Sequence, residues 1–141
     1  MHGEIREYRA LLALNPGQPT VLNNLAYTYS ERGQNLNEAL SYVLQALLSE
    51  PNNSYFVDTL GWVYYKQGRF DDAERELVRA TRMEDGNSSV HFEHLAASMD
   101  ARRVWTPERR ELRDLLTGTV NARKVARVKE LLGKIDAAQA R

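Results

Sequence analysis

Two histidines, His91 and His94, lie three positions apart, which places them on the same face if this segment is helical. Histidine nitrogens are common zinc ligands, and Glu93 lies between the two. However, the order of these residues differs from the His-Glu-x-x-His motif of zinc proteases, and no third ligand is evident. We therefore expect histidines in a groove or on the surface, without a metal.

The chain carries few of the patterns that support catalysis. It has no glycine-rich phosphate-binding loop and no nucleophile elbow. It also contains no cysteine, which excludes a disulfide framework and thiolate metal sites. The sequence therefore predicts a protein that is not an enzyme and that uses no cofactor.

Charge and hydropathy argue against two further classes of partner. The 141 residues include 19 basic and 19 acidic side chains, so no net charge attracts nucleic acid or an anionic membrane. No apolar run approaches the roughly 20 residues that a membrane-spanning helix needs. Residues 118–141 carry six basic side chains against two acidic ones, which we interpret as the solvated face of a terminal helix. We expect neither nucleic-acid binding nor direct membrane insertion.

An internal repeat is the strongest pattern in the chain. Two five-residue phrases stand 35 residues apart, Leu25-Ala26-Tyr27-Thr28-Tyr29 and Leu60-Gly61-Trp62-Val63-Tyr64. Each phrase is followed four residues later by a glycine, Gly33 and Gly68. Further on, three apolar positions of the first copy match three of the second: Ala39, Val43 and Ala46 against Ala73, Leu77 and Ala80. A repeat of this length predicts helical hairpins that stack side by side.

This pattern resembles the tetratricopeptide repeat. The first helix carries a large residue, leucine, a small residue and tyrosine, and the second carries alanine, a large apolar residue, alanine and proline, in the order of that family's consensus. The resemblance implies an all-α, right-handed solenoid of helical hairpins with a C-terminal capping helix. Both copies are similar in style to bacterial adaptor and scaffold proteins of this family.

Periodicity and turn residues divide the chain into helices and repeats. The predicted helices cover residues 3–14, 19–32, 36–49, 53–67, 70–83, 88–102, 107–117 and 120–138. The expected segments are the second helix of a truncated upstream repeat at 1–17, repeats at 18–52 and 53–87, a degenerate repeat at 88–118, and a capping helix at 119–141. Because the first segment lacks a partner helix, we interpret the chain as a fragment of a longer array, with a natural N-terminal cap as the alternative.

Small residues determine how closely the two helices of a hairpin can approach. Ala26 and Gly61 occupy the same position in the two copies, between large apolar residues. A larger side chain at Gly61 is expected to overpack the hairpin. In the degenerate repeat Arg103 takes the place of the turn glycine.

The family resemblance also implies where a partner binds. In tetratricopeptide repeats the first helices line a concave groove, and the residues that flank the core positions face it. The candidate partner-binding residues here are Asn23, Asn24, Tyr27, Glu31, Tyr55, Asp58, Thr59, Trp62, Tyr65, Lys66 and His94. Tyr27 and Trp62 are equivalent and are expected to stack as an aromatic shelf. The alternative is that both rings pack against the first helix of the neighbouring repeat.

Two binding modes of the family fit this groove poorly. Asn24 matches an asparagine that holds a peptide backbone in some members, but Thr59 replaces it in the next repeat. Asn23 and Asp58 stand where other members carry lysines that clasp a C-terminal carboxylate. We therefore expect neither a ladder of backbone-binding asparagines nor a carboxylate clamp.

The resemblance implies a non-catalytic scaffold or adaptor that binds a protein or peptide partner. One alternative is self-association into a homo-oligomer. Another is a segment that positions a larger enzyme or secretion complex. Family resemblance favours the bacterial periplasm or envelope over the cytoplasm.

Overall fold

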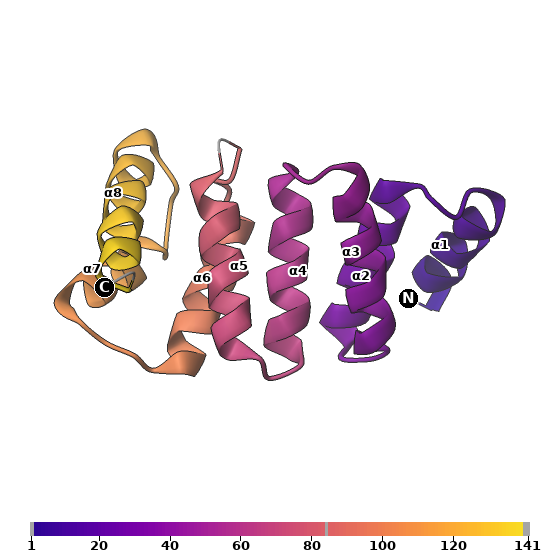
Figure 1. The fold of residues 1–141 in the computed structure, drawn as a ribbon, viewed down its shortest axis with the longest axis horizontal. Coiled ribbons are helices and arrows are strands. Elements are labelled where there is room, and N and C mark those ends of the chain that lie inside the picture. The colour runs from indigo at the N-terminus through magenta and orange to yellow at the C-terminus, as the bar shows by residue number, and fades with distance from the viewer. Residues whose placement is uncertain (1, 84, 140–141) are drawn as a thin grey trace.

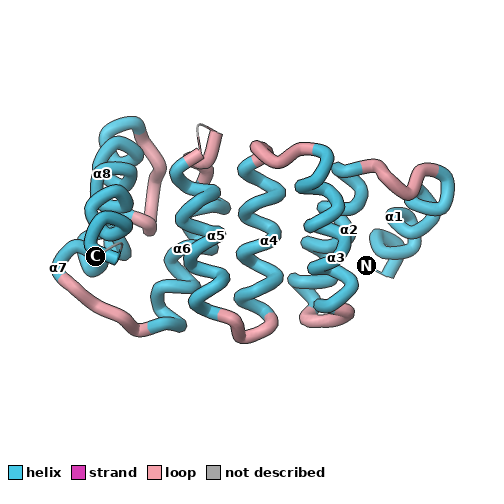
Figure 2. Tube along the Cα trace, in the orientation of Figure 1, coloured by secondary structure: helices cyan, strands magenta, loops and turns pink. Residues whose placement is uncertain are grey.

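The chain folds into helices that run side by side. The computed structural model describes residues 2–83 and 85–139, so residue 84 and the outer ends of the predicted segments 1–17 and 119–141 lie outside the described residues. Within them the helices are α1 (His2–Leu14), α2 (Pro19–Arg32), α3 (Leu36–Ser49), α4 (Ser54–Lys66), α5 (Phe70–Arg82), α6 (Ser89–Arg102), α7 (Pro107–Leu115) and α8 (Ala122–Gln139). They follow one another along the long axis from α1 to α8 (Figure 1), joined by short loops (Figure 2). The eight predicted helices are confirmed, and their boundaries shift most at the end of α7 and the start of α8.

Local sequence signals explain where these helices begin and end. The Asn53 side chain accepts hydrogen bonds from the first backbone N–H groups of α4, and Thr106 does the same for α7. Gly33 and Gly68 follow α2 and α4 in the left-handed conformation, with φ of 63° and 80°. Arg103 takes this conformation after α6, with φ of 58°, at a cost of about 1–2 kcal/mol that glycine would avoid.

Successive helices pack as an all-α helical-repeat solenoid, which confirms the predicted fold class. The hairpins α2–α3 and α4–α5 are the most closely packed pairs. The first helices α2, α4 and α6 also contact one another in order and form one layer. Behind this layer, α3 packs on α2 and α4, and α5 packs on α4 and α6. Three helices from different parts of the sequence therefore share one face.

Small residues bring the helices of a hairpin close together, as the sequence predicts. Ala26 and its neighbour Leu25 are fully buried in a cluster with Ala39 and Val43 of α3. In the next hairpin, a Cβ atom at Gly61 would lie 2.6 Å from Leu77 Cγ and 3.2 Å from the Ala73 carbonyl oxygen. Both distances are shorter than ordinary van der Waals contact, so the close packing of α4 on α5 requires glycine at this position.

The end of the solenoid is built differently. Among the described residues α7 packs chiefly against α8, whereas α6 and α7 make few close backbone contacts. Apolar residues of α7, of its C-cap and of α8 still cover the core formed by α5 and α6; they are Leu112, Leu116, Val128, Leu131, Leu132 and Ile135. Helices α7 and α8 together therefore cover the core at this end, whereas a single second helix covers it in each earlier repeat.

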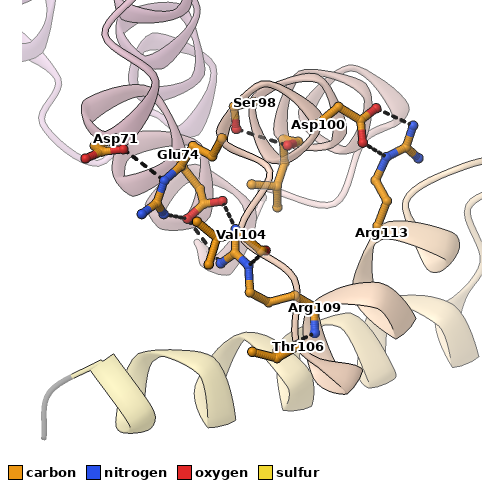
Figure 3. A network of polar contacts seen from close by, with 10 residues as sticks. Asp71, Glu74, Ser98, Asp100, Val104, Thr106, Arg109 and Arg113 are labelled. Atoms are coloured by element: carbon orange, nitrogen blue, oxygen red, sulfur yellow. Dashed lines mark hydrogen bonds and ion pairs between the residues drawn. The ribbon is translucent and has the colours of Figure 1, made fainter.

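A buried ion pair connects α7 to α5 (Figure 3). The Arg109 guanidinium is bidentate to the Glu74 carboxylate, and the exposed fractions of the two side chains are 4% and 6%. Arg109 Nε also donates to the Val104 carbonyl oxygen. Arg102 adds a second guanidinium, which bridges Glu74 and Asp71. The buried carboxylate is therefore fully hydrogen-bonded, as a buried charge must be.

Gly61→Ala is expected to lower the free energy of unfolding by about 1–3 kcal/mol, because the added methyl group overlaps Leu77. Gly133→Ala in α8 is the matched control, since a Cβ atom there meets nothing within 4 Å. The control should gain up to about 1 kcal/mol from helix propensity. Urea unfolding followed by circular dichroism measures both variants. Equal effects would show that the hairpin does not need glycine at position 61.

Glu74→Ala is expected to cost about 3–5 kcal/mol of unfolding free energy, because it leaves the buried guanidinium of Arg109 without a carboxylate. Arg109→Ala is expected to cost less than Glu74→Ala but more than an exposed pair, because Arg102 still pairs with Glu74. Replacing both residues with methionine should restore much of that loss. Arg75→Ala, which removes an exposed ion pair with Asp72, is the control and should cost less than about 1 kcal/mol. Chemical denaturation of the four variants gives the comparison. Single variants no worse than the control would contradict a structural role for the buried pair.

Candidate protein-binding groove

The layer of first helices carries all the predicted site residues. Four lie on α2, six on α4 and one, His94, on α6. Their spacing of three and four residues along α2 and α4 places them on one face of each helix. They form two adjoining groups: a hollow between α2 and α4, and a cluster of rings around Trp62 that we call the Trp62 cluster.

The hollow has a volume of about 270 Å³. It is lined by Tyr8, Asn23, Asn24, Tyr27, Thr28, Tyr55, Asp58, Thr59 and Val90. Six of these are predicted site residues. Tyr8 of α1 was not predicted, because its spacing matches a core position of a second helix. Its ring does pack on the core of the first hairpin, and it also forms one wall of the hollow.

The Trp62 cluster contains the other five predicted residues. The Trp62 ring stacks on Tyr65 with a centroid distance of 4.6 Å and on His94 at 4.0 Å. Its Nε1 donates a hydrogen bond of 2.6 Å to Glu31 Oε1 on α2. Lys66 Nζ lies 5.3 Å from the ring centroid, within cation–π range. Trp62 is thus held by both neighbouring first helices while it stays partly exposed. The ring therefore packs against the neighbouring first helices, and its contact with a partner stays a prediction.

The aromatic shelf differs from the prediction in one respect. The Tyr27 ring lies against His94, with a centroid distance of 6.0 Å and an angle of 41° between the planes. His94 stacks on Trp62, so a histidine from α6 contacts both rings that were expected to stack on each other. The side chain that joins the shelf comes from the degenerate repeat, where sequence comparison shows no aromatic residue at the equivalent position.

His94 is buried and paired with a carboxylate. Its Nδ1 lies 2.7 Å from Asp58 Oδ2, and the exposed fractions of the two side chains are 7% and 4%. The other carboxylate oxygen, Asp58 Oδ1, is buried without a hydrogen-bond partner among the described residues, and so is Asn23 Oδ1. Both residues line the hollow. The sequence identified them as groove residues but did not reveal that their oxygens are unpaired.

The two histidines have separate neighbours. His91 is buried, with Nδ1 against Ser88 Oγ and its ring 4.8 Å from the Tyr55 ring. His94 faces Asp58 and Trp62 instead. Within residues 2–83 and 85–139, no group of three or more histidine, aspartate or glutamate side chains could hold a metal ion.

Carboxylates near the hollow act on Tyr27, one of the residues that line it. The pKa of Tyr27 is raised to about 12, first by burial and then by the nearby carboxylates of Glu31 and Asp58. Both causes disfavour the phenolate, and the second one would favour a cation at the same place.

Two basic residues of α8, Arg127 and Lys124, bind groups within the protein. Arg127 pairs with Glu111 and Glu130, which raises the pKa of Arg127 and lowers that of Glu111. Lys124 Nζ donates to the Thr117 carbonyl oxygen at 2.7 Å. As for membranes, none of the helices in the described part of the chain combines the length and apolar character needed to span one.

Trp62→Phe is expected to keep most of the folding stability, because phenylalanine can still stack on Tyr65 and His94. Loss of the exposed hydrogen bond to Glu31 should cost about 1 kcal/mol or less. Trp62→Ala should lose about 2–3 kcal/mol, since the ring contacts disappear as well. Urea unfolding by far-ultraviolet circular dichroism compares the two variants. If they were equally unstable, stacking would not be what holds the Trp62 cluster together.

Comparison with known proteins supports the resemblance seen in the sequence. No protein-family model matches the chain. Over 88 residues, or 62% of the chain, the sequence is 33% identical to a TPR repeat-containing protein of Pseudomonas aeruginosa. The matched region covers only 15% of that relative's length. The repeated residues, the stacked helical hairpins and this similarity together confirm the resemblance of the chain to the tetratricopeptide repeats.

Proposed function

We propose that this chain is a non-catalytic scaffold that binds a protein or peptide partner along the face of α2, α4 and α6. The observation that carries the proposal is the set of partly exposed aromatic rings on this face. Trp62 is fixed by Tyr65, His94 and Glu31, so little side-chain entropy is lost when a partner covers it. Fixed aromatic rings of this kind supply much of the energy in protein interfaces.

The charged side chains around the groove indicate which kind of partner segment fits it. The carboxylates of Glu31, Asp58 and Glu93 all act on Tyr27, and Lys66 is the basic residue among the predicted groove residues. A basic segment complements such a surface better than an acidic one. This agrees with the expectation that the groove does not clasp a C-terminal carboxylate.

The similarity to a TPR repeat-containing protein supports a role in protein interaction, since stacked helical repeats offer extended surfaces to partners. Because the match covers a small part of the longer relative, it supports this role for the matched repeats alone. On family resemblance alone, we propose that the bacterial periplasm or envelope is favoured over the cytoplasm.

Self-association is a second candidate function, favoured by exposed leucines away from the groove. The exposed fractions are 48% and 85% for Leu11 and Leu14 of α1, and 43% and 86% for Leu44 and Leu48 of α3. Exposed apolar side chains of this size are potential contact points for a second copy of the chain. Light scattering over a dilution series would show whether these leucines mediate such contact.

Tyr55→Ala is expected to weaken partner binding at least about tenfold, equivalent to about 1.4 kcal/mol, because Tyr55 is a half-exposed ring in the groove. The partners would be peptides selected on the wild-type chain from a random display library, with affinities measured by fluorescence anisotropy. Leu48→Ala is the matched control, as it removes an exposed apolar side chain outside the groove, and it should leave these affinities unchanged.

The same pair of variants separates the two candidate functions. If the chain is a groove scaffold, the selected peptides should bind Tyr55→Ala more weakly than wild type, and the chain should be a monomer at all concentrations. Self-association predicts a dimer that Leu48→Ala weakens. If the selected peptides bound both variants as tightly as wild type, the groove proposal would be wrong.

A further inference from the structure

We propose that the hollow between α2 and α4 is a socket for a positively charged side chain of the partner, a lysine ammonium or an arginine guanidinium. This inference rests on the proposed function and adds the chemistry of one contact. It is carried by two unpaired buried oxygens, three aromatic rings and the absence of any positive charge in the wall of the hollow.

The two oxygens are acceptors without donors. Asn23 and Asp58 are 9% and 2% exposed, and Oδ1 of each has no hydrogen-bond partner among the described residues. Leaving such a group unpaired destabilises the fold, and more so when the group is charged. His94 occupies only the second oxygen of Asp58. The hollow therefore favours an occupant that brings N–H donors, and the carboxylate favours one that is positively charged.

The rings of the hollow add attraction for a cation. Tyr8, Tyr27 and Tyr55 line it from α1, α2 and α4. The face of an aromatic ring attracts an ammonium or guanidinium group through its quadrupole. None of the residues that line the described hollow is lysine, arginine or histidine, so nothing there repels a cation.

Other occupants fit less well. An anion would face Asp58 without a basic partner. A divalent metal ion would find one carboxylate, and no group of three metal-binding side chains is found in the described chain. A neutral amide could donate to both oxygens but would leave the carboxylate uncompensated. The volume of about 270 Å³ far exceeds the roughly 30 Å³ share of one water molecule, so the end of a long side chain has room to enter.

The test uses the whole chain labelled with ¹⁵N and small blocked amino acids as probes. N-acetyl-lysine N-methylamide and its arginine counterpart are expected to shift the backbone amide signals around Asn23, Tyr27 and Asp58 and to saturate at millimolar concentration. The norleucine and glutamine counterparts, which lack the charge, should bind at least about tenfold more weakly. Trimethyl-lysine keeps the charge but has no N–H donor on its ammonium group, and it should also bind more weakly than lysine.

Asn23→Asp provides a gain-of-function variant. It adds a second carboxylate to the hollow and should tighten binding of the lysine and arginine probes about three- to tenfold. Asn52→Asp adds the same charge in an exposed loop outside the hollow and is the control, for which no change is expected. Circular dichroism shows whether both variants are folded. If Asn23→Asp does not fold, the probe series on the wild-type chain still tests the socket.

Equal binding of lysine and norleucine would overturn the socket, and so would probe binding that a folded Asn23→Asp variant leaves unchanged. If trimethyl-lysine bound as tightly as lysine, the two oxygens would not be the recognition groups and the inference would be wrong. The proposed function would survive these outcomes wherever Tyr55→Ala still weakens the selected peptides. If the proposed function were wrong, the selected peptides would instead bind Tyr55→Ala as tightly as wild type.

Discussion

The close approach of α4 to α5 at Gly61 determines the geometry of the groove. Without a side chain at this position, α4 lies against Leu77 and Ala73 of α5. The next residue, Trp62, then lies on the layer of first helices, where it reaches Glu31 of α2 and the ring on α6. A bulkier residue would move α4 outward and separate these partners. One small residue therefore governs both the packing of the hairpin and the placement of the central ring of the groove.

The two buried carboxylates of the α4–α5 hairpin differ in how completely they are paired. The carboxylate of Glu74 receives two guanidinium groups, so its burial joins α5 to α7 without an unpaired acceptor. The carboxylate of Asp58, a residue that lines the hollow, has one partner, His94, and one oxygen without a hydrogen-bond partner among the described residues. Folded proteins pair nearly all buried polar groups, and exceptions call for an explanation such as a ligand. The first arrangement leaves no unpaired acceptor, while the second leaves one, which is the acceptor that the proposed socket would use.

Much of the fold could be predicted from the sequence, because repeated leucine, alanine and glycine positions define each helix and the face it buries. The prediction that Arg103 substitutes for a turn glycine is also correct, since Arg103 lies as far from the start of α6 as Gly33 and Gly68 lie from the starts of α2 and α4. The contacts between repeats could not be predicted in the same way. Asp58 and His94 are 36 positions apart and meet only because α4 and α6 are neighbours. The Glu74–Arg109 pair depends on α7 leaving the usual position of a second helix, which no local pattern signals.

The pairing of Asp58 with His94 links the hollow to the degenerate repeat. One oxygen of the Asp58 carboxylate contacts His94 of α6, and the other has no hydrogen-bond partner among the described residues. In an array where each repeat contacts only its neighbours, such shared groups transmit a change at one repeat to the next. A cation in the hollow would draw the negative charge of Asp58 toward itself and weaken its attraction for His94. His94 also stacks on Trp62, so occupancy of the hollow would alter the ring contacts of the Trp62 cluster as well. If the socket is occupied as proposed, the hollow and the Trp62 cluster would respond together through the contacts of His94.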